Sequence, residues 1–266
     1  MLKPVATAPR VRRPTVDLPL LAIPHVIHVG ALAGRPDLTP ASVEGQCLSV
    51  SLHPREWRRI AGVQGPGWLL RRDGARFLDF HRAALDGDLV SRMRRWLARE
   101  DYLDSPRMMY MVIWDDGPQQ RFGTTGEKAE AKRQARRLAA QGHEVSLMRG
   151  IGRPANRRLL ERMGHQRDGA DLSVLLDTFG FLAYIEDTHP EVDGIWWADR
   201  LAPAQLSAPR GGIFPGRLAS WSGIRLSRRE EQQVAAHLQT VADPRLLGGE
   251  GLGMTPRGGI GAPTLG

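Results

Sequence analysis

The segment Val192-Asp-Gly-Ile-Trp-Trp-Ala-Asp-Arg-Leu201 decides how we interpret the fold of this chain. Two adjacent tryptophans lie at its centre with an aspartate on either side, and we interpret the segment as a strand. Adjacent side chains on a strand project to opposite faces. We therefore expect one of Trp196 and Trp197 to lie in the core and the other to face a cleft or an interface.

Strand-like and helix-like segments alternate outward from this point. Strands are expected at 25–30, 47–51, 68–71, 76–80, 108–114, 120–124 and 144–148, and helices at 54–60, 91–100, 124–141, 154–163, 171–188 and 227–242. Strands that interleave with helices in no strict βα order predict an α+β fold. The segments from 108 to 148 form a β-β-α-β unit.

Local signals support several of these boundaries. Asp73-Gly74 lies between two apolar runs and predicts a β-hairpin. Ser51 can cap a helix that begins at Pro54, because proline suits the first helical turn. Capping boxes are expected at Thr124 with Glu127 and at Ser227 with Glu230, and Gly142 is expected to end the first of these helices.

The chain of 266 residues is long enough for one large domain or two small ones. Residues 1–18 mix proline, arginine and threonine and are expected to form a disordered basic arm. Residues 248–266 are rich in glycine and are expected to form a flexible tail. The α+β domain then spans 19–247, with the β-β-α-β unit at 105–150 either inserted into it or continuous with its sheet.

The chain carries a net charge of +8 and has a pI of about 10.6. Its only lysines are Lys3, Lys128 and Lys132, so arginine supplies 34 of the 37 basic residues. Two explanations stay open: a GC-rich genome that encodes arginine in place of lysine, and a polyanionic partner. The cations of the helix at 124–141 likewise suit either a solvated face or a phosphate-facing surface.

Several classes of protein are excluded or disfavoured. The single cysteine, Cys47, rules out an internal disulfide framework and multi-cysteine metal sites, and fits a reducing compartment. No apolar run approaches the ~18 residues of a membrane span, and the N-terminus does not resemble a signal peptide. We expect a cytoplasmic protein with no membrane partner, or one delivered or secreted without a cleavable signal. Walker, GxGxxG, GxSxG and HExxH motifs are absent.

Polar groups within apolar strands are the candidates for a site. His28 is either a satisfied core histidine or a ligand-binding group; His25 would point to the opposite face, so we expect no metal site. Ser49 and Ser51 share one strand face and either meet a ligand or serve as a cap and a solvated edge. The loop at 207–212 is either an anion cradle or an ordinary turn.

These segments resemble the ADP-ribosyltransferase superfamily, most closely its RES-domain and bacterial toxin branches. The resemblance rests on His28-Val-Gly30, on Ser49-Val-Ser51 followed by Pro54, on the Asp-Gly-Ile-Trp-Trp strand and on the Ser-x-Pro-Arg loop. It covers roughly residues 25–60 and 190–215. It implies a split, mostly antiparallel β core with flanking helices that holds NAD+ as a substrate.

The resemblance also implies roles for particular residues. His28 and Asp199 would be catalytic, with His28 at the nicotinamide ribose and Asp199 in place of the family's late glutamate, for which Asp193 and Glu186 are substitutes. The NAD+ site would be formed by Gly30, Ser49, Ser51, Trp57, Trp197, Ser207 and Arg210, with a tryptophan on the nicotinamide or adenine ring and Arg210 at the pyrophosphate. A carboxylate would stabilise the oxocarbenium-like state as nicotinamide leaves.

Three functions follow from these observations. The first is an NAD+-dependent ADP-ribosyltransferase that modifies a macromolecular acceptor, either protein or nucleic acid, for example as a bacterial toxin. The alternative is a noncatalytic nucleic-acid-binding or mobile-element or virion accessory protein that uses its arginine-rich surface. The third is a structural or assembly protein whose tails engage partners.

Overall fold

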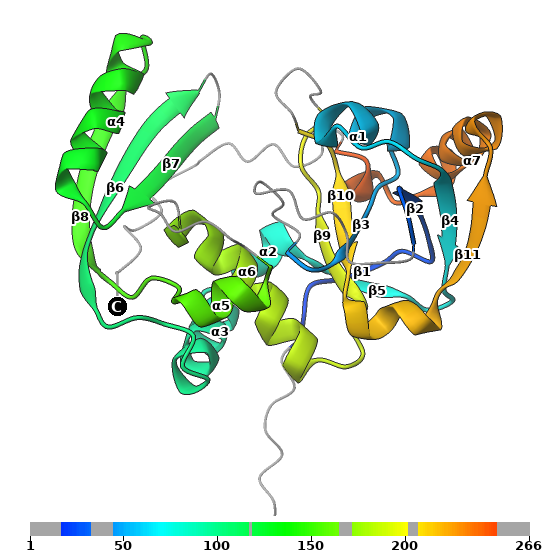
Figure 1. Ribbon diagram of the computed structural model, residues 1–266, viewed down its shortest axis with the longest axis horizontal. Helices are drawn as coiled ribbons and strands as arrows, with labels where there is room; N and C mark the ends of the chain where they lie inside the picture. Colours follow the sequence, from blue (N-terminus) through cyan, green and yellow to red (C-terminus); the bar gives the residue numbers. More distant parts are fainter. Residues whose placement is uncertain (1–16, 33–44, 117–118, 165–171, 202–206, 249–266) are drawn as a thin grey trace, which may run out of the picture.

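The computed structural model describes residues 17–32, 45–116, 119–164, 172–201 and 207–248, and it leaves undescribed the side chains of 116, 119–124 and 172–177. Most of the expected basic arm and glycine-rich tail lies outside these ranges. The described chain is a mixed α+β structure with mostly antiparallel sheets, which confirms the predicted class (Figure 1).

Two sheets form the larger part of the molecule. One has the order β1 (Leu20–Ala22), β5 (Arg76–Asp79), β9 (Gly194–Trp197), β10 (Arg210–Ile213) and β3 (Leu48–Val50). The other has the order β11 (Ser222–Leu226), β4 (Gly67–Arg71) and β2 (His25–Val29). All pairs are antiparallel except β5 with β9.

The two sheets are joined at one point. Ile27 at the middle of β2 and Ser51 just after β3 exchange both backbone hydrogen bonds, at 3.1 and 2.9 Å. Because β2 and β3 are edge strands of their sheets, this bridge makes a continuous but sharply bent β layer. The β core is therefore divided into two sheets that share a single seam.

The Asp73-Gly74 turn is present, but the predicted hairpin is wrong. Gly74 has a φ of 70° and the Ala75 amide donates to the Arg72 carbonyl, as expected of a tight turn. The flanking strands do not pair with each other, because β4 pairs with β2 and β11 while β5 pairs with β1 and β9. The turn instead carries the chain from one sheet to the other.

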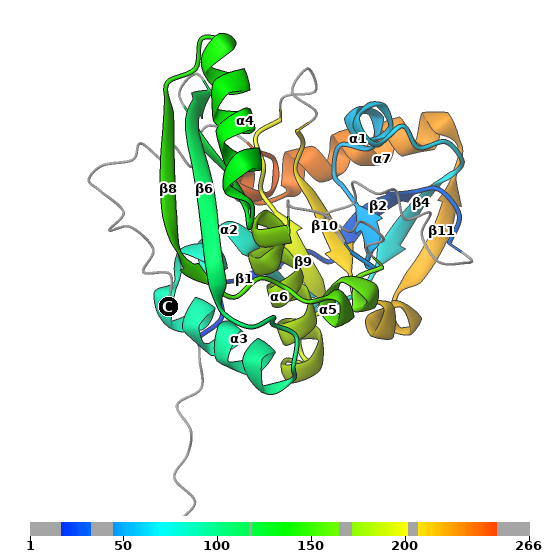
Figure 2. The same ribbon diagram turned by 60° about the vertical axis from the view of Figure 1, so that its left-hand side comes forward.

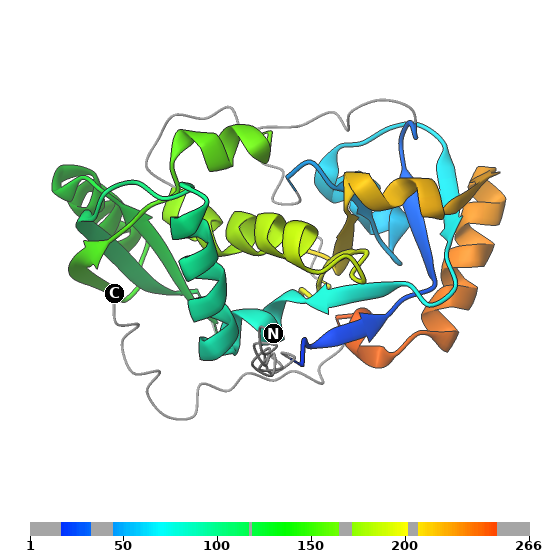
Figure 3. The same cartoon turned by 90° about the horizontal axis from the view of Figure 1, so that it is seen from below.

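Two buried clusters lie on opposite faces of the five-stranded sheet. One contains Trp197 and packs against α3 (Gly87–Arg99), α5 (Arg157–Arg162) and α6 (Leu172–Thr188), and the other contains Trp196 and lies toward the second sheet and α7 (Arg228–Val241). Figure 3 shows α6 running through the middle of the molecule. The tryptophans do face opposite sides, but both are buried, at 0% and 3% exposure, so neither faces solvent.

Helices near the centre begin differently from the sequence prediction. A helix was expected only from Ser91, and the structure adds α2 (Phe80–Leu85) and starts α3 at Gly87. The side chains of Asp79 and Asp86 cap these two helices by accepting backbone N–H bonds of their first turns. Asp79 thereby ends the preceding strand one residue earlier than predicted.

The capping predictions had mixed outcomes. The box of Ser227 with Glu230 at α7 is confirmed, since both reciprocal hydrogen bonds are present. α1 (Pro54–Ala61) begins with proline as predicted, but its N-cap residue is His53, and Ser51 accepts a hydrogen bond from the His53 amide at 3.0 Å. Ser51 lies two residues too early to be the N-cap because it still belongs to the sheet seam.

The predicted β-β-α-β unit is present as β6 (Arg107–Asp116), β7 (Gln119–Thr125), α4 (Lys128–Ala140) and β8 (Val145–Gly152). Its sheet has the order β7-β6-β8 and its own small core around Val112, which α4 covers. The predicted box of Thr124 with Glu127 is wrong: Glu127 is the N-cap without a side-chain bond, and Thr125 accepts from its amide instead. Gly142 follows α4 at a φ of 88°, as predicted for a helix end.

The second half of the segment 207–212, which was expected to be a loop as either an anion cradle or an ordinary turn, is instead part of a strand. β10 holds Arg210 and the two glycines that follow it, and pairs with both β9 and β3. A side chain at Gly211 would overlap the ring of Trp196, and one at Gly194 would overlap the Gly212 carbonyl oxygen and the Phe77 ring. Gly211 and Gly194 therefore let strands and bulky rings approach one another.

No helix within the described ranges has both the length and the apolar character needed to cross a bilayer.

Replacing Gly194 with alanine tests this packing. Because the new methyl group would collide with backbone and with a ring, Gly194→Ala should lower the free energy of unfolding by about 2–3 kcal/mol. Gly87→Ala is the matched control, since a Cβ there meets nothing within 4 Å. Urea denaturation of both variants measures the difference, and equal midpoints would contradict the close approach of β9 and β10.

Candidate functional site

Three residues predicted for the site surround the guanidinium of a fourth, Arg210. Its carbon lies 5.8 Å from the ring centre of Trp57 on α1 and 5.6 Å from that of Trp197 on β9. One of its nitrogens donates to the carboxylate of Asp199 at 2.5 Å. A planar cation held between two aromatic rings and a carboxylate is fixed in orientation, because each contact restricts a different direction.

His81 is a fifth member of this group, and the sequence analysis did not identify it. Its Nε2 lies 3.0 Å from the other carboxylate oxygen of Asp199. Burial alone would raise the pKa of Asp199, but the His81 hydrogen bond and the charge of Arg210 outweigh burial and hold that pKa below its usual value. Asp199 is therefore a carboxylate at neutral pH, and it is 26% exposed.

Ser49 and Ser51 lie beside this group on the same face of the sheet. The pairing of Ser49 with Gly212 and of Arg210 with Trp197 shows that these residues project from one side of β3, β10 and β9. The Ser51 hydroxyl donates to the Pro209 carbonyl at 2.8 Å, next to Arg210. The Ser49 hydroxyl is buried with no hydrogen-bond partner among the described residues, which is unusual for a buried polar atom.

His28, on the second sheet, contacts the main chain of Ser49. We refer to His28, Ser49, Ser51 and the residues around Arg210 together as the row. Its Nδ1 donates to the Ser49 carbonyl at 2.8 Å, while its Nε2 lies 3.3 Å from the Ala31 carbonyl. Burial lowers the pKa of His28 despite these carbonyls, so the ring is neutral at neutral pH and carries one N–H. With one N–H, the neutral ring can donate to only one of these two carbonyls.

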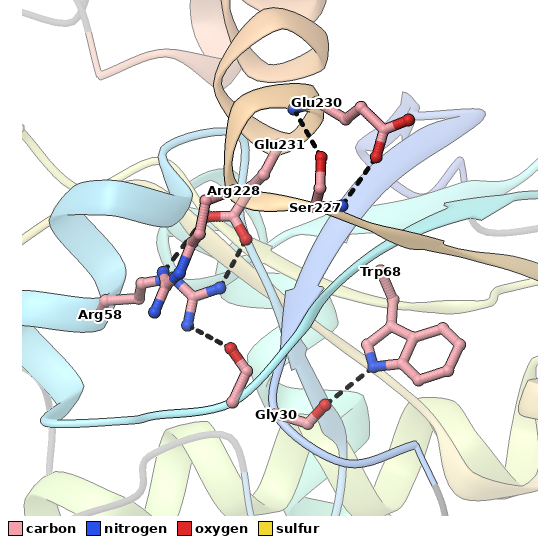
Figure 4. Close-up of polar contacts among 8 residues, drawn as sticks. Gly30, Arg58, Trp68, Ser227, Arg228, Glu230 and Glu231 are labelled. Atoms are coloured by element: carbon pink, nitrogen blue, oxygen red, sulfur yellow. Dashed lines mark hydrogen bonds and ion pairs between the residues drawn. The ribbon is translucent and has the colours of Figure 1, made fainter.

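Gly30 keeps the space beside His28 open. It has a φ of 128°, which favours glycine, and a Cβ there would lie 3.3 Å from His28 Nε2. Figure 4 shows the Trp68 ring nitrogen donating to the Gly30 carbonyl, at 2.8 Å. The position of Gly30 is thus set by both its backbone conformation and a side chain from β4.

A buried ion pair contacts the loop that contains Gly65, which lies against Gly30. Arg58 on α1 makes two hydrogen bonds to the carboxylate of Glu231 on α7, at 3.1 and 2.5 Å, and a third to the Gly65 carbonyl (Figure 4). Glu231 is only 3% exposed, and it occupies the space where a side chain at Gly67 would lie. The pair ties α1 and α7 to the loop that approaches Gly30.

Three predicted residues lie apart from this row. Asp193 is at the opposite end of β9 from Asp199, where it pairs with Arg72 and accepts from the Arg76 amide, so it holds the strands and is no substitute for Asp199. Glu186 on α6 forms an ion pair with Arg162 on α5. Ser207 is half-buried three residues before β10.

An open, polar hollow lies elsewhere on the molecule and contains none of the predicted site residues. It is lined by His25, Arg71, Arg72, Asp73, Ser220 and Ser222. Within the described part of the chain, no group of three or more histidine, cysteine, aspartate or glutamate side chains could hold a metal ion.

Sequence reasoning missed His81, Trp68, Arg58 and Glu231. His81 could have been found from the sequence, because Asp79 and Asp86 are both helix-capping residues and place His81 on a short helix beside the late strand. The other three act from elements whose neighbours are distant in sequence: Arg58 and Glu231 are 173 positions apart.

Comparison of the chain with known protein families, with curated proteins and with solved structures found no match.

Asp199→Asn tests the electrostatics of the group. Because the pKa of Asp199 is lowered in the folded protein, the carboxylate stabilises the fold above the pKa of the unfolded chain, and this stabilisation is lost as pH falls through the folded pKa. At pH 7 the variant should be less stable by about 1–2 kcal/mol. This deficit should shrink as the pH drops below about 4, the ordinary aspartate range.

Thermal or urea unfolding across pH measures the deficit. Asp73→Asn is the control, because Asp73 lies exposed in the turn after β4. A deficit that is constant from pH 7 to pH 3 would contradict the role given to the carboxylate.

Proposed function

We propose that this protein is an NAD+-using ADP-ribosyltransferase that modifies a macromolecular acceptor. The observation that carries the proposal is that hydrogen bonds and strand pairing bring His28, Ser49, Ser51 and the Arg210 group together at the seam of the two sheets. A split, mostly antiparallel core of this kind also fits the fold expected from the resemblance.

Arg210 suits the pyrophosphate of NAD+. Guanidinium groups bind phosphate oxygens in a bidentate manner, and Arg210 is held rigidly between two rings. In the free protein the Asp199 carboxylate occupies it. We propose that the pyrophosphate displaces Asp199, and that the released carboxylate then faces the reacting ribose.

The tryptophans have a different role from the one the resemblance implied. Both indole rings are buried, at 9% for Trp57 and 3% for Trp197, which leaves little surface for stacking on nicotinamide or adenine. Their contact with Arg210 is already made. We therefore assign them to orienting the guanidinium, where they act through Arg210 and not on the substrate.

The other end of the row suits the nicotinamide ribose. With its proton on Nδ1, His28 can accept a hydrogen bond from a ribose hydroxyl at Nε2, and the Ser49 hydroxyl, which has no partner among the described residues, can donate one. Gly30 leaves room for the ligand beside the imidazole. These contacts would hold the sugar while its bond to nicotinamide stretches.

In the proposed reaction the C1′–N bond breaks and neutral nicotinamide leaves with the bonding electron pair. Positive charge develops on the ribose, and a nearby carboxylate stabilises it. A nucleophile of the acceptor then bonds to C1′ and loses its proton. Asp199 supplies the carboxylate, and His81, whose hydrogen bond is one of the contacts that lower the pKa of Asp199 in the free protein, favours its ionised form.

Nicotinamide release from labelled NAD+, with transfer of label to candidate protein and nucleic-acid acceptors, tests the proposal. Asp199→Asn should lower kcat about 100-fold or more, because a charge-stabilising group is lost. Arg210→Lys should mainly raise KM, by about tenfold, since a lysine cannot make the bidentate contact.

Arg225→Lys, at an exposed position of β11, is the control and should behave as wild type. If the wild-type protein neither releases nicotinamide nor transfers label under conditions where a known transferase does both, the proposal is wrong.

A further inference from the structure

β8 is a free edge strand eight residues long. The order β7-β6-β8 leaves its outer side without a paired strand among the described residues, and Figure 2 shows it as the outermost strand of its unit. The backbone N–H and C=O groups on that side are open to another strand. Edge strands usually carry lysines, proline or a bulge that prevent pairing, whereas β8 has only Arg149 as a charged residue.

Exposed apolar side chains gather on this edge. Seven large hydrophobic residues are exposed in the described chain, and four belong to β8 or its neighbour β6. They are Met108 at 43%, Leu147 at 43%, Met148 at 43% and Ile151 at 58%. Clustering of exposed apolar residues on one element is typical of an interaction surface.

A basic helix lies over one face of the same sheet. Val145 packs against the core beneath α4, so strand alternation places Leu147 and Ile151 on the α4 side and Met148 on the other. The exposed cations of α4 form no ion pair with another described residue. They are Lys128, Lys132, Arg133, Arg136 and Arg137.

We propose that the β8 edge and α4 together bind an extended acidic polypeptide segment, which adds to the sheet as a fourth strand. Main-chain hydrogen bonds along β8 would supply binding that does not depend on side chains, as in β-augmentation. On the α4 side, where Leu147, Arg149 and Ile151 follow one another at every second position, apolar side chains of the segment would lie opposite Leu147 and Ile151. An acidic side chain between them would lie opposite Arg149, toward the cations of α4, and would raise the association rate.

Other occupants fit the surface less well. A nucleic acid would pair with the cations but would leave the strand edge and its apolar side chains uncovered. A second copy joined through β8 would bring two basic helices to the same face of one sheet, where their like charges repel. A protein segment of opposite charge matches both features, and the proposal does not depend on the transferase activity.

The test uses the full chain and a fluorescent ten-residue peptide, Val-Thr-Glu-Thr-Val-Thr-Glu-Thr-Val-Thr, which presents valine and glutamate in turn on one face of a strand. Binding is followed by fluorescence anisotropy, with hydrogen exchange of 145–152 as a second readout. We expect the double variant Leu147→Ser/Ile151→Ser to bind about tenfold more weakly, with Val241→Ser unchanged as the matched exposed control. Lys132→Glu/Arg136→Glu should weaken binding similarly, whereas Arg229→Glu on α7 should not.

A peptide of the same sequence with alternate amides N-methylated keeps the charge but cannot pair with a strand. We expect it to bind at least tenfold more weakly and to leave 145–152 unprotected. Equal binding of both peptides, or no binding of either, overturns the proposal. It is also overturned if a single-stranded oligonucleotide protects 145–152 better than the peptide, or if the protein alone is a dimer already protected at β8.

Discussion

The bridge between Ile27 and Ser51 is the interaction on which the rest of the β structure depends. It is formed by two backbone hydrogen bonds, and it is where the five-stranded and three-stranded sheets meet. His28 follows one partner of the bridge and Ser49 precedes the other by two residues, so the bridge sets the distance between their side chains. The seam of the fold and the centre of the candidate site are therefore the same place.

Buried charges hold the elements around this seam. The pair of Arg58 and Glu231 fastens two helices to the loop behind Gly30, and the pair of Arg72 and Asp193 fastens the crossing between the sheets. A buried pair contributes little net stability over apolar packing, but loss of one partner costs about 3–5 kcal/mol. Such pairs thus favour one arrangement of the elements over others more than they stabilise the folded state.

Features encoded within a few residues could be predicted from the sequence, and features that depend on distant pairing could not. The α+β class, the β-β-α-β unit and the Ser227 capping box rest on local patterns and are confirmed. The Asp73-Gly74 turn was also local, but which strands it joined was decided by partners elsewhere in the chain. The same division applies to the site: residue types on strands were identified, whereas the pairing of Arg58 with Glu231 depends on elements 173 positions apart.

The central position of β10 has a consequence for synthesis of the chain. This strand lies between β3 and β9, so residues near 50 obtain their sheet neighbour only when residues 210–213 have been made. Translation at about 5–20 residues per second implies a delay of roughly ten to thirty seconds between the two strands. During that interval β3 has an open edge that chaperones can protect, and the row that includes Arg210 cannot exist. Any activity that needs this row therefore begins only when most of the chain has left the ribosome.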